Sequence, residues 1–203
     1  MDESVIRAIA RWPDVPAVFG WLALNRRGQW LLRDSPLTHE RAIGFINRNY
    51  ASDERGRWFF QNGPQRVYVA LELAPFVAHF VDDRLFSHVG EWLDHIDRVL
   101  IDEQGNVFLD RPGGAALLDD RDLLQFSEQL LDAAGQPAVD EVVEAMLEAD
   151  GVELELGFRY AGRTVPIERI HGECVPGRLG FVRTPDEAPV AEARQDQPSD
   201  ARS

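Results

Sequence analysis

The residues best suited to chemistry lie close together in the run INRNYASDERGRWFFQNGPQRVYV, positions 46 to 69. Its arginines carry fork-shaped guanidinium groups, which suit carboxylate or phosphate ligands. Its amide side chains add neutral donors, and aromatic residues could supply a stacking wall. We therefore expect a loop that binds an anionic small molecule or an acidic peptide. The candidate ligand-binding residues are Arg48, Asn49, Asp53, Arg55, Trp58, Gln61, Asn62 and Arg66.

Three alternatives stay open for this run. In the first, Asp53 and the neighbouring arginines satisfy one another and the exposed backbone, and the aromatic residues are core. In the second, the protein is an enzyme that uses Asp53 as a base beside Arg48, Arg55 or Arg66. In the third, Trp58 and Phe59 stack on single-stranded nucleic acid. Because no complete catalytic set is evident, a noncatalytic binding or regulatory module is the favoured interpretation.

The other reactive side chains are dispersed. His39 stands in HERAI, which lacks the second histidine of a zinc-protease HExxH motif. His171 and Cys174 have no further cysteine to complete a metal site. The acidic clusters at positions 82–83 and 119–122 do not match a calcium loop. We therefore expect neither a metal nor a cofactor.

The basic residues are all arginine, and the absence of lysine excludes several mechanisms. A phosphate-binding P-loop needs its lysine, and Schiff-base or pyridoxal chemistry needs an amine nucleophile. The sequence also has no GxSxG, GxGxxG or paired CxxC motif. The common hydrolase, dinucleotide-binding and zinc-ribbon classes are therefore without support.

The net charge of −14 is unevenly distributed. Residues 1–70 hold ten arginines and seven acids, about +3, whereas residues 71–203 hold eleven arginines and twenty-eight acids, about −17. A polyanion is bound mainly by neutralising its phosphates, so nucleic acid is not an expected partner. The two parts are expected to dock electrostatically or to present solvated faces.

The sequence favours a cytoplasmic location. Asp2 and Glu3 stand where a signal peptide would carry positive charge, and no apolar run reaches the roughly 18 residues of a transmembrane helix. The single cysteine, Cys174, has no partner for an internal disulfide, which agrees with a reducing compartment. The sequence does not define an oligomeric state.

Four segments carry hairpin signals, in which apolar strands flank a glycine-containing turn. The predicted turns are at 25–28, 62–63, 104–106 and 161–162. A helix is expected between the first two hairpins, begun by Ser35 or Thr38, and two amphipathic helices are expected within 119–149. A short helix is expected at 89–95.

This order predicts an α+β fold of antiparallel β-hairpins with helices, and it suggests two pseudo-repeated ββαββ units side by side. Leu24, Gly28 and Trp30 overlay Ile101, Gly105 and Val107 at a constant offset of 77 residues. We expect a first unit at 12–76, a connector at 77–97, a second unit at 98–183 and a disordered tail at 184–203.

Three runs together resemble the signature of an uncharacterised proteobacterial family, a domain of unknown function. They are WPDVPAVFGWLAL at 12–24, GFINRNY at 44–50 and DERGRWFFQNGPQRVYV at 53–69. The resemblance covers roughly the first 75 residues and implies no activity, cofactor or partner. The acidic remainder of the chain lies outside it.

Overall fold

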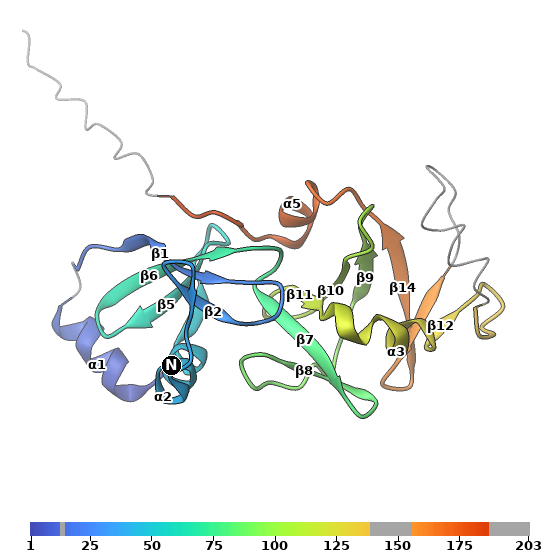
Figure 1. Cartoon of the computed structure of the whole chain (residues 1–203), viewed down its shortest axis with the longest axis horizontal. Coiled ribbons are helices and arrows are strands. Elements are labelled where there is room, and N and C mark those ends of the chain that lie inside the picture. The colour runs from blue at the N-terminus through green and yellow to red at the C-terminus, as the bar shows by residue number, and fades with distance from the viewer. Residues whose placement is uncertain (13–14, 139–155, 187–203) are drawn as a thin grey trace, which may run out of the picture.

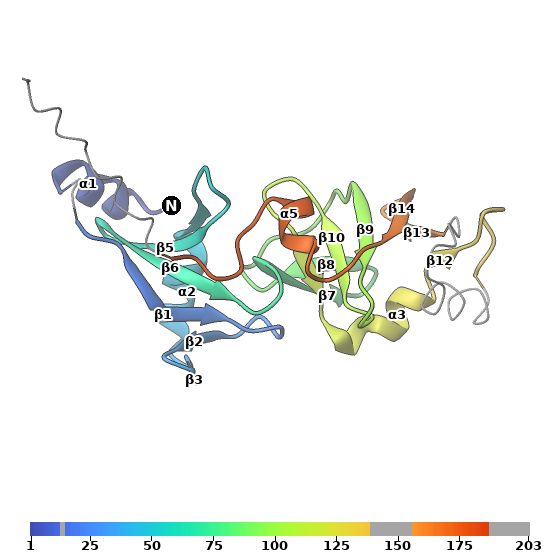
Figure 2. The same cartoon turned by 90° about the horizontal axis from the view of Figure 1, so that it is seen from above.

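A computed structural model describes residues 1–12, 15–138 and 156–186. Two mixed β-sheets lie next to each other along the long axis of the molecule, and short helices pack on them (Figure 1 and Figure 2). The α+β class predicted from the sequence is confirmed. No helix among the described residues is long and apolar enough to cross a membrane.

The first sheet has six strands in the order β3-β2-β1-β6-β5-β4. Its central pair, β1 and β6, is parallel, and every other pair is antiparallel. The helix α1 (Glu3–Arg11) precedes the sheet, and α2 (Glu40–Arg48) lies between the third and fourth strands. The strands are β1 (Val18–Leu24), β2 (Trp30–Leu32), β3 (Ser35–Pro36), β4 (Tyr50–Ser52), β5 (Trp58–Asn62) and β6 (Gln65–Leu71).

The second sheet has eight strands in the order β12-β13-β14-β9-β10-β11-β7-β8. The helical turn η1 (Asp120–Asp122) and α3 (Leu123–Ser127) follow β11, and α5 (Val175–Leu179) follows β14. The strands are β7 (Phe76–Val81), β8 (Arg84–Ser87), β9 (Arg98–Ile101), β10 (Val107–Asp110), β11 (Ala116–Leu118), β12 (Leu130–Leu131), β13 (Gly157–Tyr160) and β14 (Arg163–Arg169).

The two sheets repeat one strand order, which bears out the pseudo-repeat. In each, three strands, a helix and three more strands follow one another, and the first strand pairs in parallel with the last. Leu22 pairs with Leu32 and Val69, and its counterpart Val99 pairs with Leu109 and Ile167. Each unit has six strands where ββαββ would have four, because the two-residue strands β3 and β12 and the three-residue strands β4 and β11 escape a periodicity test. We call β1–β6 with α2 the first unit, and β9–β14 with α3 the second unit.

The four predicted hairpins are confirmed, since they are β1–β2, β5–β6, β9–β10 and β13–β14. The predicted first helix is α2, although His39 caps it in place of Ser35 or Thr38 by accepting a hydrogen bond from the Ala42 N–H. Of the two helices expected within 119–149, the first is reduced to η1 and α3. The second falls at 139–149, outside the described residues.

The short helix predicted at 89–95 is wrong. Gly90 adopts a φ of 94°, and Ser87 and Glu91 close a tight turn there through backbone hydrogen bonds. The segment predicted as a connector instead carries β8 and most of β7, which extend the second sheet. The predicted domain limits remain predictions. Of the predicted tail, residues 187–203 lie outside the described part of the chain.

Five rings join the two sheets into one core. Trp30, Tyr50 and Trp58 of the first unit meet Phe76 and His88 of the β7–β8 hairpin, with ring centroids 4.8 to 6.3 Å apart. Contacts of this type add about 1 kcal/mol each beyond the area they bury. The buried side chains of both sheets form one continuous cluster.

Ion pairs add to this junction. The Arg27 guanidinium at the β1–β2 turn lies 3.1 Å from Asp120 and 3.6 Å from Asp119 of the second unit. Arg26 donates from Nη2 to the Asn106 side chain at 2.7 Å. The more basic first unit therefore contacts the acidic second unit through charge, which was one of the two expectations from the sequence.

Candidate functional site

The predicted binding loop contains a type of turn that occurs four times among the described residues. In each turn an Asp or Asn side-chain oxygen accepts the backbone N–H groups two and four residues ahead, and a glycine three residues ahead has a φ between 72° and 78°. Such side chains stabilise turns by hydrogen-bonding the local backbone. The four turns are Asn25–Gln29, Asp53–Arg57, Asp102–Asn106 and Asp132–Gln136. Each unit has two of them, at equivalent places in its strand order.

Asp53 has further partners that hold it in place. Its carboxylate receives Arg57 Nε at 2.9 Å and the Tyr68 hydroxyl at 3.0 Å. The side chains of Asp53 and Arg57 are only 12% and 15% exposed. Burial raises the pKa of Asp53, but the hydrogen bonds from Arg57, Tyr68 and the backbone of Arg55 outweigh it and hold that pKa below its ordinary value. Asp53 therefore acts as the hub of a closed network.

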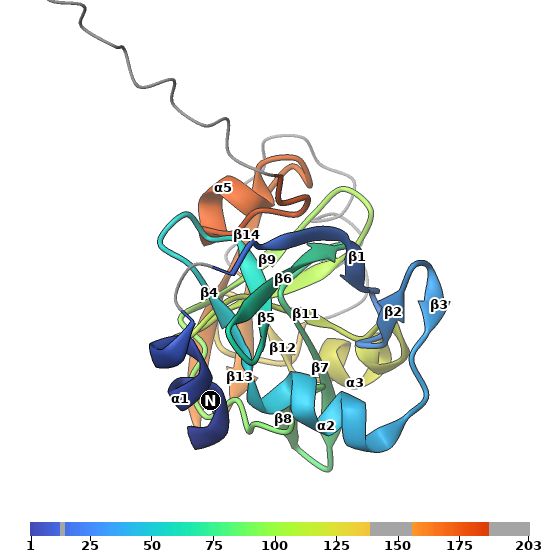
Figure 3. The same cartoon turned by 90° about the vertical axis from the view of Figure 1, so that its left-hand side faces the viewer.

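The final described segment, Gly180–Asp186, packs against this loop, and we call it the C-terminal strap. Val182 N–H donates to Gly56 O at 2.9 Å, and Leu71 N–H donates to Arg183 O at 2.7 Å. Arg57 Nη1 donates to the backbone carbonyl of Asp186 at 3.1 Å. A side chain at position 56 would clash with the Gly180 carbonyl oxygen, so only glycine fits. The strap runs back from the second unit over the first, and Figure 3 shows α5 and α2 on opposite sides of the molecule.

The other polar candidates occupy separate positions. Asn49 and Gln61 are buried. Asn49 receives the Asp2 N–H at 2.8 Å and donates to Phe45 O, while Gln61 donates to Gly63 O. Arg48 pairs with Asp2 at 3.3 Å on the surface. The Asn49 and Arg48 contacts tie the start of α1 to the end of α2, and the Gln61 bond stabilises the β5–β6 turn.

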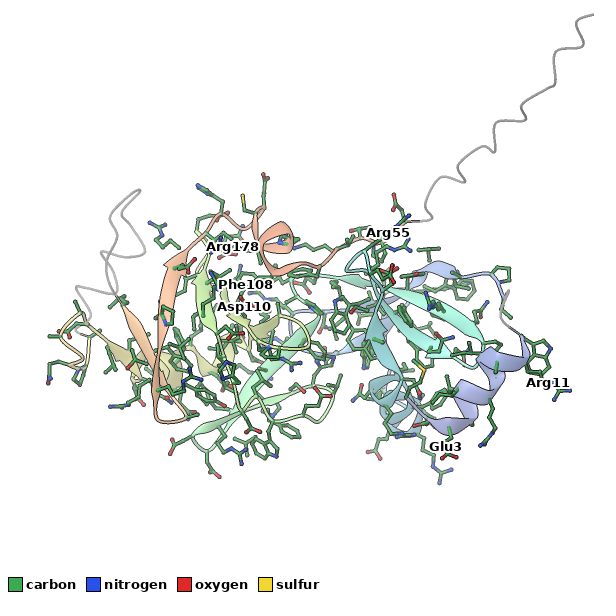
Figure 4. All side chains as sticks on the ribbon, turned by 180° about the vertical axis from the view of Figure 1, so that it is seen from behind. Glu3, Arg11, Arg55, Phe108, Asp110 and Arg178 are labelled. Carbon is green, nitrogen blue, oxygen red and sulfur yellow. The ribbon has the colours of Figure 1, made fainter. Side chains whose placement is uncertain are left out.

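The remaining four candidates lie in four different places. Arg66 stacks over Phe59 at 4.6 Å. Arg55 is exposed beside the strap, while Arg11 projects from the far end of α1 (Figure 4). Trp58 and Asn62 each line a hollow, but not the same one. No single cavity among the described residues collects the eight candidates, and their role in ligand binding stays a prediction.

The hollow at Asn62 is an apolar groove of about 350 Å³ on the α2 side of the first sheet. Trp21 and Leu32 on its wall are 46% and 47% exposed, and together they leave an apolar patch open to solvent. Polar atoms enter only at one end, from Asn62 and Gln65. The groove is lined by Val18, Trp21, Leu22, Leu32, Phe60, Asn62, Gln65 and Val67.

A β-bulge shapes the groove. Val18 pairs with Val67 and Leu22 with Val69, so β1 spends four residues where β6 spends two. Gly20, within the bulge, has a φ of 72°. Bulges turn side chains away from the regular alternation and are frequent beside functional sites. Trp21 is thereby placed on the groove wall, and the Arg33 guanidinium lies 3.6 Å over its ring.

The hollow at Trp58 is a cavity of about 260 Å³ between the two units and the strap, and we call it the junction cavity. Loop 111–114 of the second unit forms one side, and Gly114 packs so closely on the Trp58 ring that a side chain there would lie 2.5 Å from it. The cavity is lined by Ser52, Trp58, Pro75, Gly113, Gly114, Ala115, Leu179, Gly180 and Phe181.

Arg111 is a buried cation at the same junction. Its side chain is only 9% exposed and stacks over Phe76 at 4.3 Å. Nη1 donates to Pro112 O, but Nε and Nη2 are buried without a hydrogen-bond partner, and the Glu91 carboxylate lies 3.6 Å from Nη2. Burial lowers the pKa of Arg111, partly opposed by Glu91. Unpaired buried donors are costly and call for an explanation.

His88 is neutral at physiological pH. Burial lowers the pKa of His88 to about 3, and the Arg111 charge adds to the shift. Nδ1 accepts the Val77 N–H at 3.1 Å, so the proton is assigned to Nε2, which has no partner. Nothing in the sequence predicts that Arg111 or His88 would be buried.

No group of three or more His, Cys, Asp or Glu side chains in the described part of the chain could hold a metal ion. His39 caps α2, and Cys174 is exposed with its backbone N–H bonded to His171 O. Asp119 is bonded to Arg121 and paired with Arg27. Each of these residues thus has a structural place.

The geometry defines an α+β protein of two pseudo-repeated units with an apolar groove on one unit and a cavity at their junction. Residues 1–186 match the model of the family DUF2944, described as "Protein of unknown function (DUF2946)", and the chain belongs to that family. The chain also resembles the crystal structure of a DUF1285 family protein from Silicibacter pomeroyi DSS-3. The TM-score is 0.53 at 16% identity, covering 78% of this chain and 85% of that one.

A second DUF1285 family structure, from Shewanella baltica OS155, matches with a TM-score of 0.43 and 15% identity, covering 52% of this chain and 89% of that one. No curated protein matches the chain. The likeness to the first structure supports the fold alone, because its identity is low.

The closed Asp53 network predicts a specific loss of acid stability. Because the folded pKa of Asp53 lies below its unfolded value of about 3.9, the ionised form stabilises the fold above that pH, and the contribution disappears as pH falls through the folded pKa. Asp53→Asn should therefore cost about 2 kcal/mol at pH 7 and flatten the dependence of unfolding free energy on pH below about 5.

Urea unfolding from pH 7 to pH 3 measures both effects, with Glu54→Gln, an exposed neighbour, as the matched control. An Asp53→Asn variant whose stability falls with acid as steeply as that of the native chain would contradict the closed network.

Proposed function

We propose that the protein is a noncatalytic binding module whose first unit recognises an acidic polypeptide segment with apolar anchors. The observation that carries this proposal is the groove, where Trp21 and Leu32 remain about half exposed on an apolar wall. Completing the burial of one such half-exposed side chain contributes about 1 kcal/mol. A partner that covers the groove therefore gains affinity from two anchors already in place.

Charge supports an acidic partner. The first 70 residues carry about three net positive charges, from ten arginines and seven acids. Arg33 holds its guanidinium over Trp21 at the groove wall. Oppositely charged surfaces raise association rates and reject partners of like charge. The groove thus offers apolar affinity with an electrostatic preference for carboxylates.

The enzyme alternative has no observation in its favour. Both Asp53 oxygens are engaged by Arg57 and Tyr68, and Arg48 is paired with Asp2. Stacking on nucleic acid is also disfavoured, because Trp58 and Phe59 are buried. We place the module in the cytoplasm of a proteobacterial cell, as the single cysteine and the signature in the first 75 residues suggest.

Selection of peptides from a random display library tests the proposal. The full chain should enrich peptides that combine large aliphatic residues with Asp or Glu. Leu32→Glu, which places a charge on the apolar wall, should abolish the enrichment. Leu124→Glu is the matched control, since Leu124 is 75% exposed on α3 of the second unit. Enrichment of the same peptides by the Leu32→Glu variant would rule out the groove.

A second candidate function is binding of a small anion at the junction. Nε and Nη2 of Arg111 favour it, because they are buried without a hydrogen-bond partner and an anion could accept from both. Inorganic phosphate and a panel of small carboxylates should raise the melting temperature of the native chain, since a ligand selective for the folded state stabilises it. The Arg111→Met variant should show no such rise. Equal shifts in the native chain and the variant would exclude Arg111 as the anion ligand.

A further inference from the structure

The pseudo-repeat identifies the counterpart of the groove in the second unit. Phe60 pairs with Val67 as Phe158 pairs with Val165, and Asn62 pairs with Gln65 as Tyr160 pairs with Arg163. Leu32 likewise corresponds to Leu109, since both pair with the equivalent residue of the first strand. The groove of the first unit and the same face of the second unit are thus built from matching positions.

The two faces differ in what covers them. Leu32 is 47% exposed, whereas its counterpart Leu109 is fully buried, as is Phe158. In the second unit a segment of the chain itself, residues 84–96, is bonded to Tyr160 on this face. The Tyr160 hydroxyl donates to Leu93 O at 2.7 Å and receives the Leu85 N–H at 2.9 Å. Leu85, Leu93 and Ile96 belong to the same buried cluster as Phe158 and Tyr160.

The first unit has no such segment among the described residues. Asn62 stands where Tyr160 stands, and it is exposed. Its amide offers a donor and an acceptor, the two functions that the Tyr160 hydroxyl uses on the backbone of 84–96. The first unit therefore keeps the apolar wall and the backbone-binding group, and it lacks only the segment that they would hold.

We infer that the groove binds a segment of another protein that mimics the segment 84–96, a short strand followed by a tight turn, with two or three aliphatic side chains on the apolar wall and its backbone bonded to Asn62. This inference rests on the proposed function and specifies the shape of the partner. Recognition by backbone bonds together with side-chain pockets is a common binding mode. The mimicked segment, RLFSHVGEWLDHI, carries one Arg against one Glu and one Asp, so it is itself mildly acidic.

A labelled synthetic peptide of residues 84–96, added to the full chain, tests the inference by fluorescence anisotropy. We expect saturable binding that Leu32→Glu and Asn62→Ala each weaken at least tenfold. Leu124→Glu should bind as the native chain does. The same peptide with Ser at the positions of Leu85, Leu93 and Ile96 should not bind.

The outcomes separate this inference from the proposed function. If library peptides bind in a Leu32-dependent way but the 84–96 peptide does not, the mimicry is wrong and the binding module stands. If neither binds, both fall. A dimer of the full chain in analytical ultracentrifugation that disappears in Leu32→Glu would assign the groove to a second copy, and would overturn the choice of another protein as partner.

Discussion

The apolar face of a β-sheet must be covered, and this constraint accounts for most of the architecture. Among the described residues of the two units, α2 has nine residues and α3 has five, and neither spans a sheet face built on seven-residue strands. The second unit completes its cover with β7, β8 and the segment up to Ile96. The first unit leaves Trp21 and Leu32 at the surface. Burial of apolar area is the main favourable term in folding, so an apolar face left exposed forgoes part of the stability it could provide. A partner that covers this face is the best explanation for its exposure.

The two units share one fold but differ in what their equivalent faces contact. Both units keep the parallel central pair and the two Asp/Asn-glycine turns, which fix the register of their hairpins. The second unit devotes its helix face to its own core, and the first unit is joined to it by five rings in edge-on and tilted contacts and by Arg26 and Arg27. The strap then returns to the Asp53 loop. Stability is thus concentrated at the junction, which leaves the far part of the first sheet available for binding.

The sequence predicted the elements that local chemistry determines. A glycine that follows Asp or Asn and adopts a positive φ predicts a hairpin turn from local residue types alone. The 77-residue offset between Gly28 and Gly105 indicated the repeat. It missed β3 and β12, which at two residues have no periodicity, and it mistook the turn at Gly90 for a helix. Whether the predicted site residues are free to bind a ligand depends on the contacts they make in the folded chain, which the sequence alone does not show. Asn49, Asp53 and Gln61 look like ligand groups in sequence, but their side chains are bonded to Asp2, Arg57 and Gly63 respectively. The groove escaped notice because Trp21 and Leu32 are indistinguishable from core residues until the sheet is built.

The central claim is that equivalent faces of the two units differ in cover, and Leu32 and Leu109 report it within one molecule. Methyl-resolved NMR of the full chain with a soluble paramagnetic agent measures the solvent exposure of both leucines in a single spectrum. The account predicts strong broadening of the Leu32 methyl signals and none of the Leu109 signals. Equal protection of the two would mean that the first unit is already covered, and would contradict the account.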